Sequence, residues 1–190
     1  TVIDDDNGKD VDQLPILVKN VAPTFSSLVL SETEIDEGDT VTLDGEFDDP
    51  GIRDTYTLEI DWGDGTVETF SIGAQASGHG SFSHEHLYLD DDPDTGTPFD
   101  LLDVKVKLVD DDTGEASDTL PIKVNNVAPE WGTVTLETSP LDEGGEATLE
   151  GDFTDPGEDT FTIEVDWGDN NVETFNLDAV GSFSAGQGQF

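Results

Sequence analysis

Apolar and polar residues alternate along much of this chain with a period of two. The clearest example is the segment 56–62, in which every second residue is apolar: Tyr56, Leu58, Ile60 and Trp62. Because successive side chains of a β-strand point to opposite faces, this pattern predicts a strand with one buried face. The same alternation predicts further strands over 41–47, 104–108 and 120–124.

The fold class follows from the number and spacing of such segments. Shorter strands are predicted over 24–30, 66–72 and 81–89, and no segment has a convincing helical period. Turns rich in Gly, Asp, Asn and Pro separate them. About seven strands in roughly 100 residues predict an all-β fold, an antiparallel sandwich of two sheets. The sequences "DDDNG" (4–8) and "DDDTG" (110–114) predict hairpin turns in which Gly8 and Gly114 take a positive φ.

An internal repeat sets the domain organisation. Residues 4–23, "DDDNGKDVDQLPILVKNVAP", return as "DDDTGEASDTLPIKVNNVAP" 106 residues later, and "EIDWGDGTVETF" (59–70) returns as "EVDWGDNNVETF" 105 residues later. The "NVAP" phrase predicts an extended joint, because proline restricts its own backbone and that of the preceding residue. We therefore expect three parts: residues 1–19 as the tail of a preceding repeat, 20–125 as a complete repeat and 126–190 as an incomplete second one.

Two interpretations of this division into one complete and two partial repeats stay open. The chain can be nearly two periods of a longer tandem array, or it can be a subunit that joins others head to tail. In the second case, residues 1–19 of one copy complete the open repeat of another. Those residues contain the alternating apolar positions Leu14, Ile16 and Val18, which match Leu120, Ile122 and Val124.

Charge narrows the possible partners. The chain has 190 residues, of which 46 are acidic and 6 basic, for a formal net charge of -40. Such a chain lacks the basic patches that bind nucleic acid, and it is repelled by anionic membrane surfaces. The charge also opposes compaction, so divalent cations or high salt must offset part of it. Although high charge favours disorder, the patterned apolar residues favour a folded chain. There is no cysteine, which excludes disulfides and thiolate metal sites.

Acidic residues gather in turns, where they suit Ca²⁺, a cation bound by six to eight oxygens. The loop 48–56 carries three candidate ligands, Asp48, Asp49 and Asp54, and its second copy keeps Asp155 and Asp159. The turn 110–114 adds Asp110 and Asp112 as candidates. The alternative is a solvated acidic surface that serves solubility or salt adaptation. None of the clusters has the spacing of an EF-hand loop.

The sequence resembles the PKD domain, the immunoglobulin-like module first named from the polycystic kidney disease protein. The resemblance rests on Asn20 and Pro23, on the "WGDG" turn at 62–65, on "SHEHLYL" at 83–89, and on "VKVKLVDDDTG" at 104–114. It covers essentially the whole chain. The second copy has Asn170 where the family has Gly, and Asn tolerates the left-handed conformation that such a turn needs.

This resemblance implies tandem immunoglobulin-like sandwiches with no catalytic activity, found on cell-surface and secreted proteins as spacers, adhesion elements or accessory modules of hydrolases. It implies an extracellular location and no nucleic-acid or membrane-inserted partner. Calcium-binding members hold the ion near the Asn that starts the domain. That places Asn20 beside Asp48, Asp49 and Asp54, and Asn126 beside Asp155 and Asp159.

Catalytic interpretations have little support in the residues. Paired carboxylates could serve a glycosidase, but here they lie in repeated turns rather than in one cleft. A zinc site or base at His84 is disfavoured because the second copy has Ala185 in its place. Trp62 and Trp167 could be sugar platforms, yet their apolar-face positions favour core packing. Trp131 occupies the place of Phe25, which also indicates packing.

Overall fold

The structure is a computed structural model that describes residues 1–91, 96–137, 140–177 and 188–189. Strands make up 53% of it, and the described residues contain no α-helix. The strands are β1 (Val2–Ile3), β2 (Lys9–Asp10), β3 (Thr24–Leu30), β4 (Glu34–Asp36), β5 (Thr40–Asp48), β6 (Tyr56–Asp61), β7 (Val67–Ile72), β8 (His79–Leu87), β9 (Phe99–Asp110), β10 (Glu115–Asn125), β11 (Glu130–Leu136), β12 (Leu149–Thr154), β13 (Thr162–Asp166), β14 (Val172–Asn176) and β15 (Gly188–Gln189). The all-β class is confirmed. Among these residues, no helix has the length and apolar character needed to cross a bilayer.

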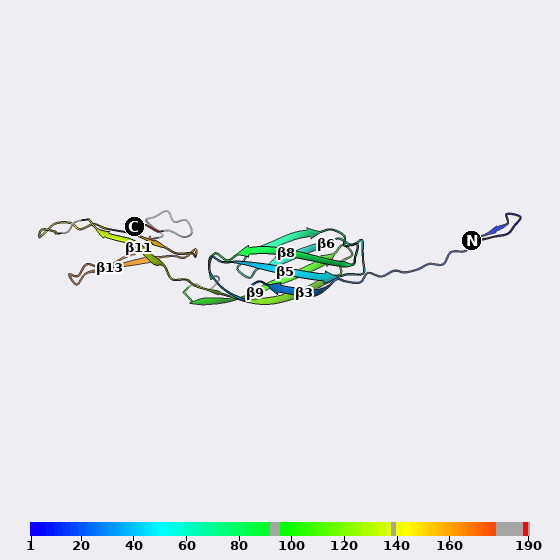
Figure 1. Cartoon of the computed structure of the whole chain (residues 1–190), viewed down its shortest axis with the longest axis horizontal. Coiled ribbons are helices and arrows are strands. Elements are labelled where there is room, and N and C mark those ends of the chain that lie inside the picture. The colour runs from blue at the N-terminus through cyan, green and yellow to red at the C-terminus, as the bar shows by residue number, and fades with distance from the viewer. Residues whose placement is uncertain (92–95, 138–139, 178–187, 190) are drawn as a thin grey trace.

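Two facing sheets form a β-sandwich at the centre of the chain (Figure 1). One sheet has the order β4-β10-β9-β6-β7 and the other has the order β3-β5-β8. All pairings are antiparallel except that between β4 and β10. The hairpin of β9 and β10 spans the 110–114 turn, as the sequence predicts. This arrangement brings the loop after β5 and the β9–β10 turn to one end of the sandwich.

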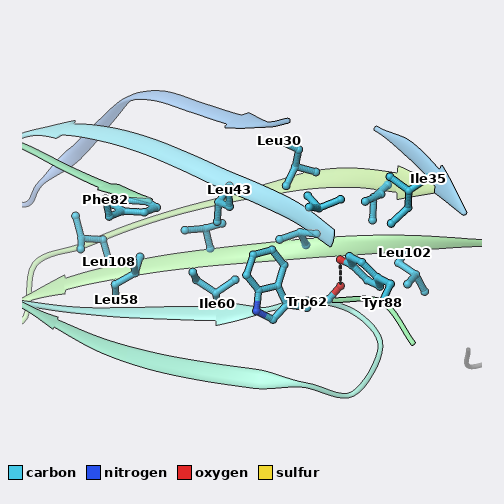
Figure 2. Packing of buried hydrophobic residues seen from close by; sticks show 14 of the residues in the cluster. Leu30, Ile35, Leu43, Leu58, Ile60, Trp62, Phe82, Tyr88, Leu102 and Leu108 are labelled. Atoms are coloured by element: carbon cyan, nitrogen blue, oxygen red, sulfur yellow. Dashed lines mark hydrogen bonds between the residues drawn. The ribbon is translucent and has the colours of Figure 1, made fainter. Parts of the chain in front are cut away.

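The core between these sheets is made by the alternating residues (Figure 2). The predicted inward face of β6 is fully enclosed, since Leu58, Ile60 and Trp62 have no exposed surface. Phe47 of β5 packs edge-on against Tyr56, with ring centroids 4.8 Å apart. Burial of each such side chain stabilises the fold by roughly 1.5–3 kcal/mol. The predicted core role of Trp62 is therefore confirmed.

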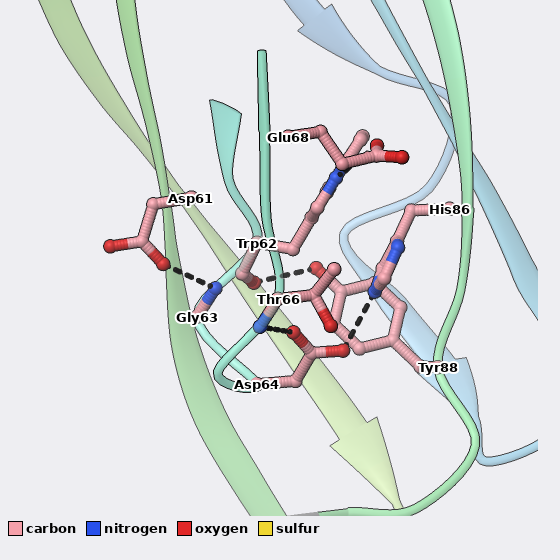
Figure 3. A network of polar contacts seen from close by, with 8 residues as sticks. All are labelled: Asp61, Trp62, Gly63, Asp64, Thr66, Glu68, His86 and Tyr88. Carbon is pink, nitrogen blue, oxygen red and sulfur yellow. Dashed lines mark hydrogen bonds and ion pairs between the residues drawn. The ribbon is translucent and has the colours of Figure 1, made fainter. Parts of the chain in front are cut away.

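The "WGDG" turn is held by a polar network that also fixes β8 (Figure 3). The Tyr88 hydroxyl donates to the Trp62 carbonyl at 2.9 Å, and the Trp62 indole N–H donates to Glu68 at 2.9 Å. His86 lies 2.7 Å from Asp64 and stacks on the Trp62 ring at 4.7 Å. These contacts make the turn and the histidine parts of the packing.

The tight turns differ from the expectation at two glycines. Gly8 and Gly114 do not carry the positive φ; Asn7 does at 70° and Thr113 does at 74°. Glycine is needed at 114 for space, because a Cβ there would lie 2.5 Å from Asp110 Oδ2 and 2.7 Å from the Ala22 backbone. Asn170 does adopt the left-handed conformation, with φ 69°, as expected.

Strands β11 to β14 repeat the order of the first half of the central sandwich. β11 pairs with β12 as β3 does with β5, and β13 pairs with β14 as β6 does with β7. Among the described residues, the apolar interior between these strands is partly open: Trp167 is 37% exposed and Trp131 is 60% exposed, although Trp131 meets the Phe153 ring at 5.9 Å. The expectation of core packing therefore fails for these two tryptophans.

Residues 1–19 extend away from the central sandwich, at the end opposite to β11 and β13 (Figure 1). β1 and β2 form a two-residue antiparallel ladder. Residues 11–19 belong to no strand of the described chain. The apolar side chains near their centre are almost fully exposed: Leu14 is 89%, Ile16 86% and Val18 82%. An extended segment with this alternation has the form of a strand without a sheet.

Candidate metal centres

Three carboxylates converge at the end of the central sandwich that faces residues 1–19. Oxygens of Asp49, Asp54 and Asp110 lie within 4.8 Å of one another, and we call this group the proximal cluster. Asp49 is only 1% exposed and its Oδ2 has no hydrogen-bond partner in the described chain. An ionised oxygen in that position is costly unless a cation or donor compensates it.

Local chain geometry explains how the proximal cluster is built. Asp49 directly follows β5, and its Oδ1 accepts the Gly51 N–H at 2.7 Å. A Cβ on Gly51 would meet Asp49 Oδ1 at 3.0 Å and overlap the Asp54 carboxylate, so glycine leaves room for both. Asp110 ends β9, and its Oδ1 accepts the N–H groups of Asp112 at 3.0 Å and Gly114 at 2.7 Å.

Asn20 ties the joint segment to this cluster. Its side-chain amide donates to Asp110 Oδ2 at 2.8 Å. The nearby Asp111 accepts the Thr55 N–H at 2.9 Å, which fastens the 48–56 loop to the β9–β10 turn. Burial, together with the charge of Asp49, raises the pKa of Asp54. Carboxylate oxygens gathered around a buried oxygen without a hydrogen-bond partner are ligands that Ca²⁺ prefers, so the three carboxylates fit that ion, whereas Asn20 presents its N–H and not its oxygen.

A second acidic group lies at the opposite end, where the central sandwich meets β11 to β14. Glu37 belongs to two sets of oxygens that each lie within 4.8 Å of one another, one with Asp155 and Asp159 and the other with Asp90 and Asp91. We call these five residues the joint cluster. Glu37 is 2% exposed, Asp155 3% and Asp91 4%, and each has one oxygen without a hydrogen-bond partner in the described chain.

Two backbone contacts hold the joint cluster together. Glu37 follows β4, and its Oε1 accepts the Val127 N–H at 2.6 Å. The Glu158 N–H donates to the Leu89 carbonyl at 2.9 Å. Asp155 Oδ1 accepts the Gly157 N–H at 2.9 Å, just as Asp49 does with Gly51. The loop of the second copy therefore has the same local form as the loop of the first.

Burial, followed by electrostatic repulsion, raises the pKa of two acids of the joint cluster. Burial, followed by the charges of Asp159, Asp155 and Asp91, raises the pKa of Glu37 to about 7, against the opposing hydrogen bond from Val127. Burial and the charge of Asp155 raise the pKa of Asp159 to about 6. Near neutral pH, protons therefore compete with any cation for the carboxylates of Glu37 and Asp159.

The structure gathers most of the residues that the sequence singles out, in two places. Asn20, Asp49, Asp54 and Asp110 meet in the proximal cluster, whereas Asp155 and Asp159 meet in the joint cluster. Asp48 does not join them, because its exposed side chain pairs with His79 at 3.0 Å. The exposed Asp112 gives the cluster only its backbone N–H. Asn126 donates its backbone N–H to the Pro98 carbonyl at 3.2 Å.

Sequence reasoning missed Glu37, Asp90 and Asp91 as candidate ligands. Asp90 and Asp91 stand in a visible acidic run, but their partners belong to the next copy of the repeat. The available signal for Glu37 was the "DEG" phrase, which recurs with Glu143. That recurrence marks a turn, and only the packing of residues 155–159 against it makes the glutamate buried.

Comparisons with known proteins identify no relative. No protein-family model matches the chain, and no curated protein matches it. Solved structures resemble it loosely. One is a Niemann-Pick type C2 protein from Japanese carpenter ant, with 8% identity, TM-score 0.38, and coverage of 56% of this chain and 96% of that one. A second is the Pseudomonas fluorescens alkylpurine DNA glycosylase AlkC, with 12% identity, TM-score 0.36, and coverage of 56% and 31%. A third is the sporulation control protein Spo0M from Bacillus subtilis, with 14% identity, TM-score 0.38, and coverage of 83% and 91%. Likeness at this level carries no functional argument.

Proposed function

We propose that the chain is a non-enzymatic structural or adhesive module of the cell surface or extracellular space, built from calcium-stabilised PKD-type repeats. The repeats are joined in a long tandem array or in a filament of head-to-tail copies. One observation carries this proposal. Strands β11 to β14 repeat the central sandwich but leave its apolar interior open, while residues 11–19 present an apolar strand that has no sheet.

The strand order of the central sandwich supports the domain type. One sheet contains β3, β5 and β8, and the other contains β10, β9, β6 and β7 with β4 added at the edge. Immunoglobulin-like sandwiches also place their first, second and fifth strands on one sheet, as β3, β5 and β8 are here, but the constant type adds the fourth strand to that sheet, whereas β7 lies on the other one. The "WGDG" turn at 62–65, its second copy "WGDN" at 167–170, and the residues that start each copy favour the PKD type within that class.

The open interior of the second copy is an apolar groove of about 320 Å³ between its two sheets. It is lined by Ala147, Thr148, Leu149, Ile163, Val165, Trp167, Phe175 and Leu177. In the central sandwich, Val104, Val106 and Ile122 of β9 and β10 fill the corresponding space. The groove thus fits one more strand with alternating apolar residues.

Two sources supply that strand. In an array, the residues that follow in the longer chain provide it. In a filament, residues 11–19 of another copy add to the free edge of β13, with Leu14, Ile16 and Val18 inserted in the groove. They then take the place that β9 has beside β6 in the central sandwich, although their sequence matches β10. Strand addition to an exposed edge is an established mode of association. Because donor and acceptor differ, the contact propagates instead of closing as a dimer.

Light scattering of the purified chain over a wide concentration range tests the filament. We expect the mass to rise with concentration, and deletion of residues 1–19 to abolish that rise while the central sandwich stays folded. Ile16→Asn, on the inserting face, should weaken association far more than Leu17→Asn, on the opposite face. A strictly monomeric intact chain would refute head-to-tail joining and leave only the array.

A second candidate function is an accessory binding module of a secreted hydrolase. The observation that favours it is the 60% exposed Trp131, since exposed aromatic rings stack on sugars. Binding to a polysaccharide or protein fibre that disappears in Trp131→Ala, with the fold intact, would support this alternative.

A further inference from the structure

We infer that the joint cluster is a Ca²⁺ site shared by two consecutive repeats, with Glu37 as the common ligand, and that the ion locks one repeat onto the next. This inference rests on the proposed role of a calcium-stabilised repeat. It adds the place where the ion acts and the mechanical consequence of its binding.

The first support is the state of the carboxylates. Glu37 Oε2, Asp91 Oδ2 and Asp155 Oδ2 are buried and have no hydrogen-bond partner in the described chain, and all three side chains belong to residues at least nine-tenths buried. The ion pairs that the described lysines form lie elsewhere, at Asp61, Glu34 and Glu115. Buried ionised oxygens without a donor need a cation.

The second support is the geometry. Two ligands on opposite sides of a Ca²⁺ ion, each at about 2.4 Å, are at most about 4.8 Å apart. The oxygens of Glu37, Asp155 and Asp159 satisfy that limit, and so do those of Glu37, Asp90 and Asp91. Such a set of carboxylates suits the flexible oxygen coordination of Ca²⁺ better than the strict octahedron of Mg²⁺.

The third support is where the ligands come from. Glu37, Asp90 and Asp91 belong to the turns at one end of the central sandwich, whereas Asp155 and Asp159 belong to the loop after β12. An ion between these sets replaces repulsion across the joint by attraction. The other contacts across the joint in the described residues include the Val127 and Glu158 N–H bonds and the approaches of Pro156 to Gly38 and of Gly157 to Glu37.

The repeat also provides a matched control. Asp155 and Asp159 occupy the places of Asp49 and Asp54, and Glu143 occupies the place of Glu37. Glu143 is exposed and lies in no acidic group of the described chain that could hold a metal. Replacement of Glu143 therefore changes the charge by the same amount as replacement of Glu37 without touching the joint cluster.

The experiment measures the joint directly. Because the chain has no cysteine, Ser117→Cys on β10 and Thr174→Cys on β14 give two exposed labelling positions, one in each repeat. Single-molecule Förster resonance energy transfer reports the distribution of distances between the two dyes, and measurement at picomolar protein suppresses head-to-tail association. We expect CaCl₂ to narrow this distribution in a saturable way, with a defined midpoint calcium concentration. NaCl of equal ionic strength should leave the distribution broad.

Glu37→Gln keeps an oxygen that accepts the Val127 N–H but removes the shared charge. We expect it to raise the calcium midpoint at least about tenfold, whereas Glu143→Gln leaves the midpoint unchanged. Asp159→Asn is a second test should Glu37→Gln unfold the chain, which circular dichroism reveals. An equal response of Glu37→Gln and Glu143→Gln, or no narrowing by calcium, overturns the inference. Neither outcome affects association through residues 1–19, so the assembly proposal fails or stands separately.

Discussion

Replacement of Trp62 tests whether the core of the central sandwich is closed to water while the apolar interior of β11 to β14 is partly open. Trp62 has no exposed surface, whereas its counterpart Trp167 is 37% exposed. Truncation of a large buried aromatic costs roughly 3–5 kcal/mol, and loss of the ring stack with His86 is part of that cost. Trp62→Ala should therefore remove a large fraction of the roughly 5–15 kcal/mol that stabilises a domain.

Circular dichroism melts of Trp62→Ala and Trp167→Ala provide the assay. For a repeat of this length, each kcal/mol shifts the melting temperature by about 4–8 °C, so a cost of roughly 3–5 kcal/mol for Trp62→Ala should lower the main transition by roughly 12–40 °C. Trp167→Ala should lower its own transition by less than about half as much, because much of that ring is already in contact with water. Equal shifts of the two melting temperatures would refute the claim that Trp62 lies in a closed core and Trp167 in a partly open one. An unchanged melting temperature for Trp62→Ala would refute its role in the core.

Three further predictions follow from the acidic clusters and turns. Calcium at about 100 times its Kd should stabilise each occupied site by about 2.7 kcal/mol, so melts in CaCl₂ should exceed melts in EGTA with matched NaCl, and equal melts would leave only charge screening. In EGTA, the raised pKa of Glu37 means that the native chain binds more protons than the unfolded chain between about pH 4.5 and 7, so stability should fall as pH rises through that window. Glu37→Gln should flatten this dependence, and an unaltered slope would contradict it. Gly114→Ala should destabilise the central sandwich by about 1–3 kcal/mol because its Cβ collides with Asp110 and the Ala22 backbone, whereas Gly73→Ala, in open space, should be close to neutral in urea unfolding.

The strand faces of the central sandwich could be predicted because alternation is a direct geometric property of strands. The side chains of Leu58, Ile60 and Trp62 could point only to one face, and that face had to be buried. β4 could not be predicted in this way. It has three residues, too few for a pattern, and it is a strand only because it lies parallel to β10.

The sequence singles out all three carboxylates of the proximal cluster, but it does not predict that Asp110 meets Asp49 and Asp54, because Asp110 lies 56 residues beyond Asp54 and only the packing of the β9–β10 turn against the 48–56 loop joins them. The joint cluster was predictable only in part, because Glu37 is buried by a loop that lies more than 100 residues away. Likewise, the exposure of Trp131 and Trp167 depends on what covers the apolar faces of β11 to β14, which alternation within a strand does not determine. Sequence patterns fix which face of a strand is apolar, but burial also depends on what covers that face.

Equilibrium dialysis against CaCl₂, with NaCl held constant, tests the central claim of a calcium-stabilised repeat most directly. The account predicts saturable binding above the non-specific background of an acidic protein. Asp49→Asn should remove the binding of the proximal cluster, Glu37→Gln should remove that of the joint cluster, and Glu143→Gln should remove neither. Binding that never saturates, or that falls equally in all three variants, would show that the carboxylates merely attract a diffuse cloud of counterions and would contradict the account.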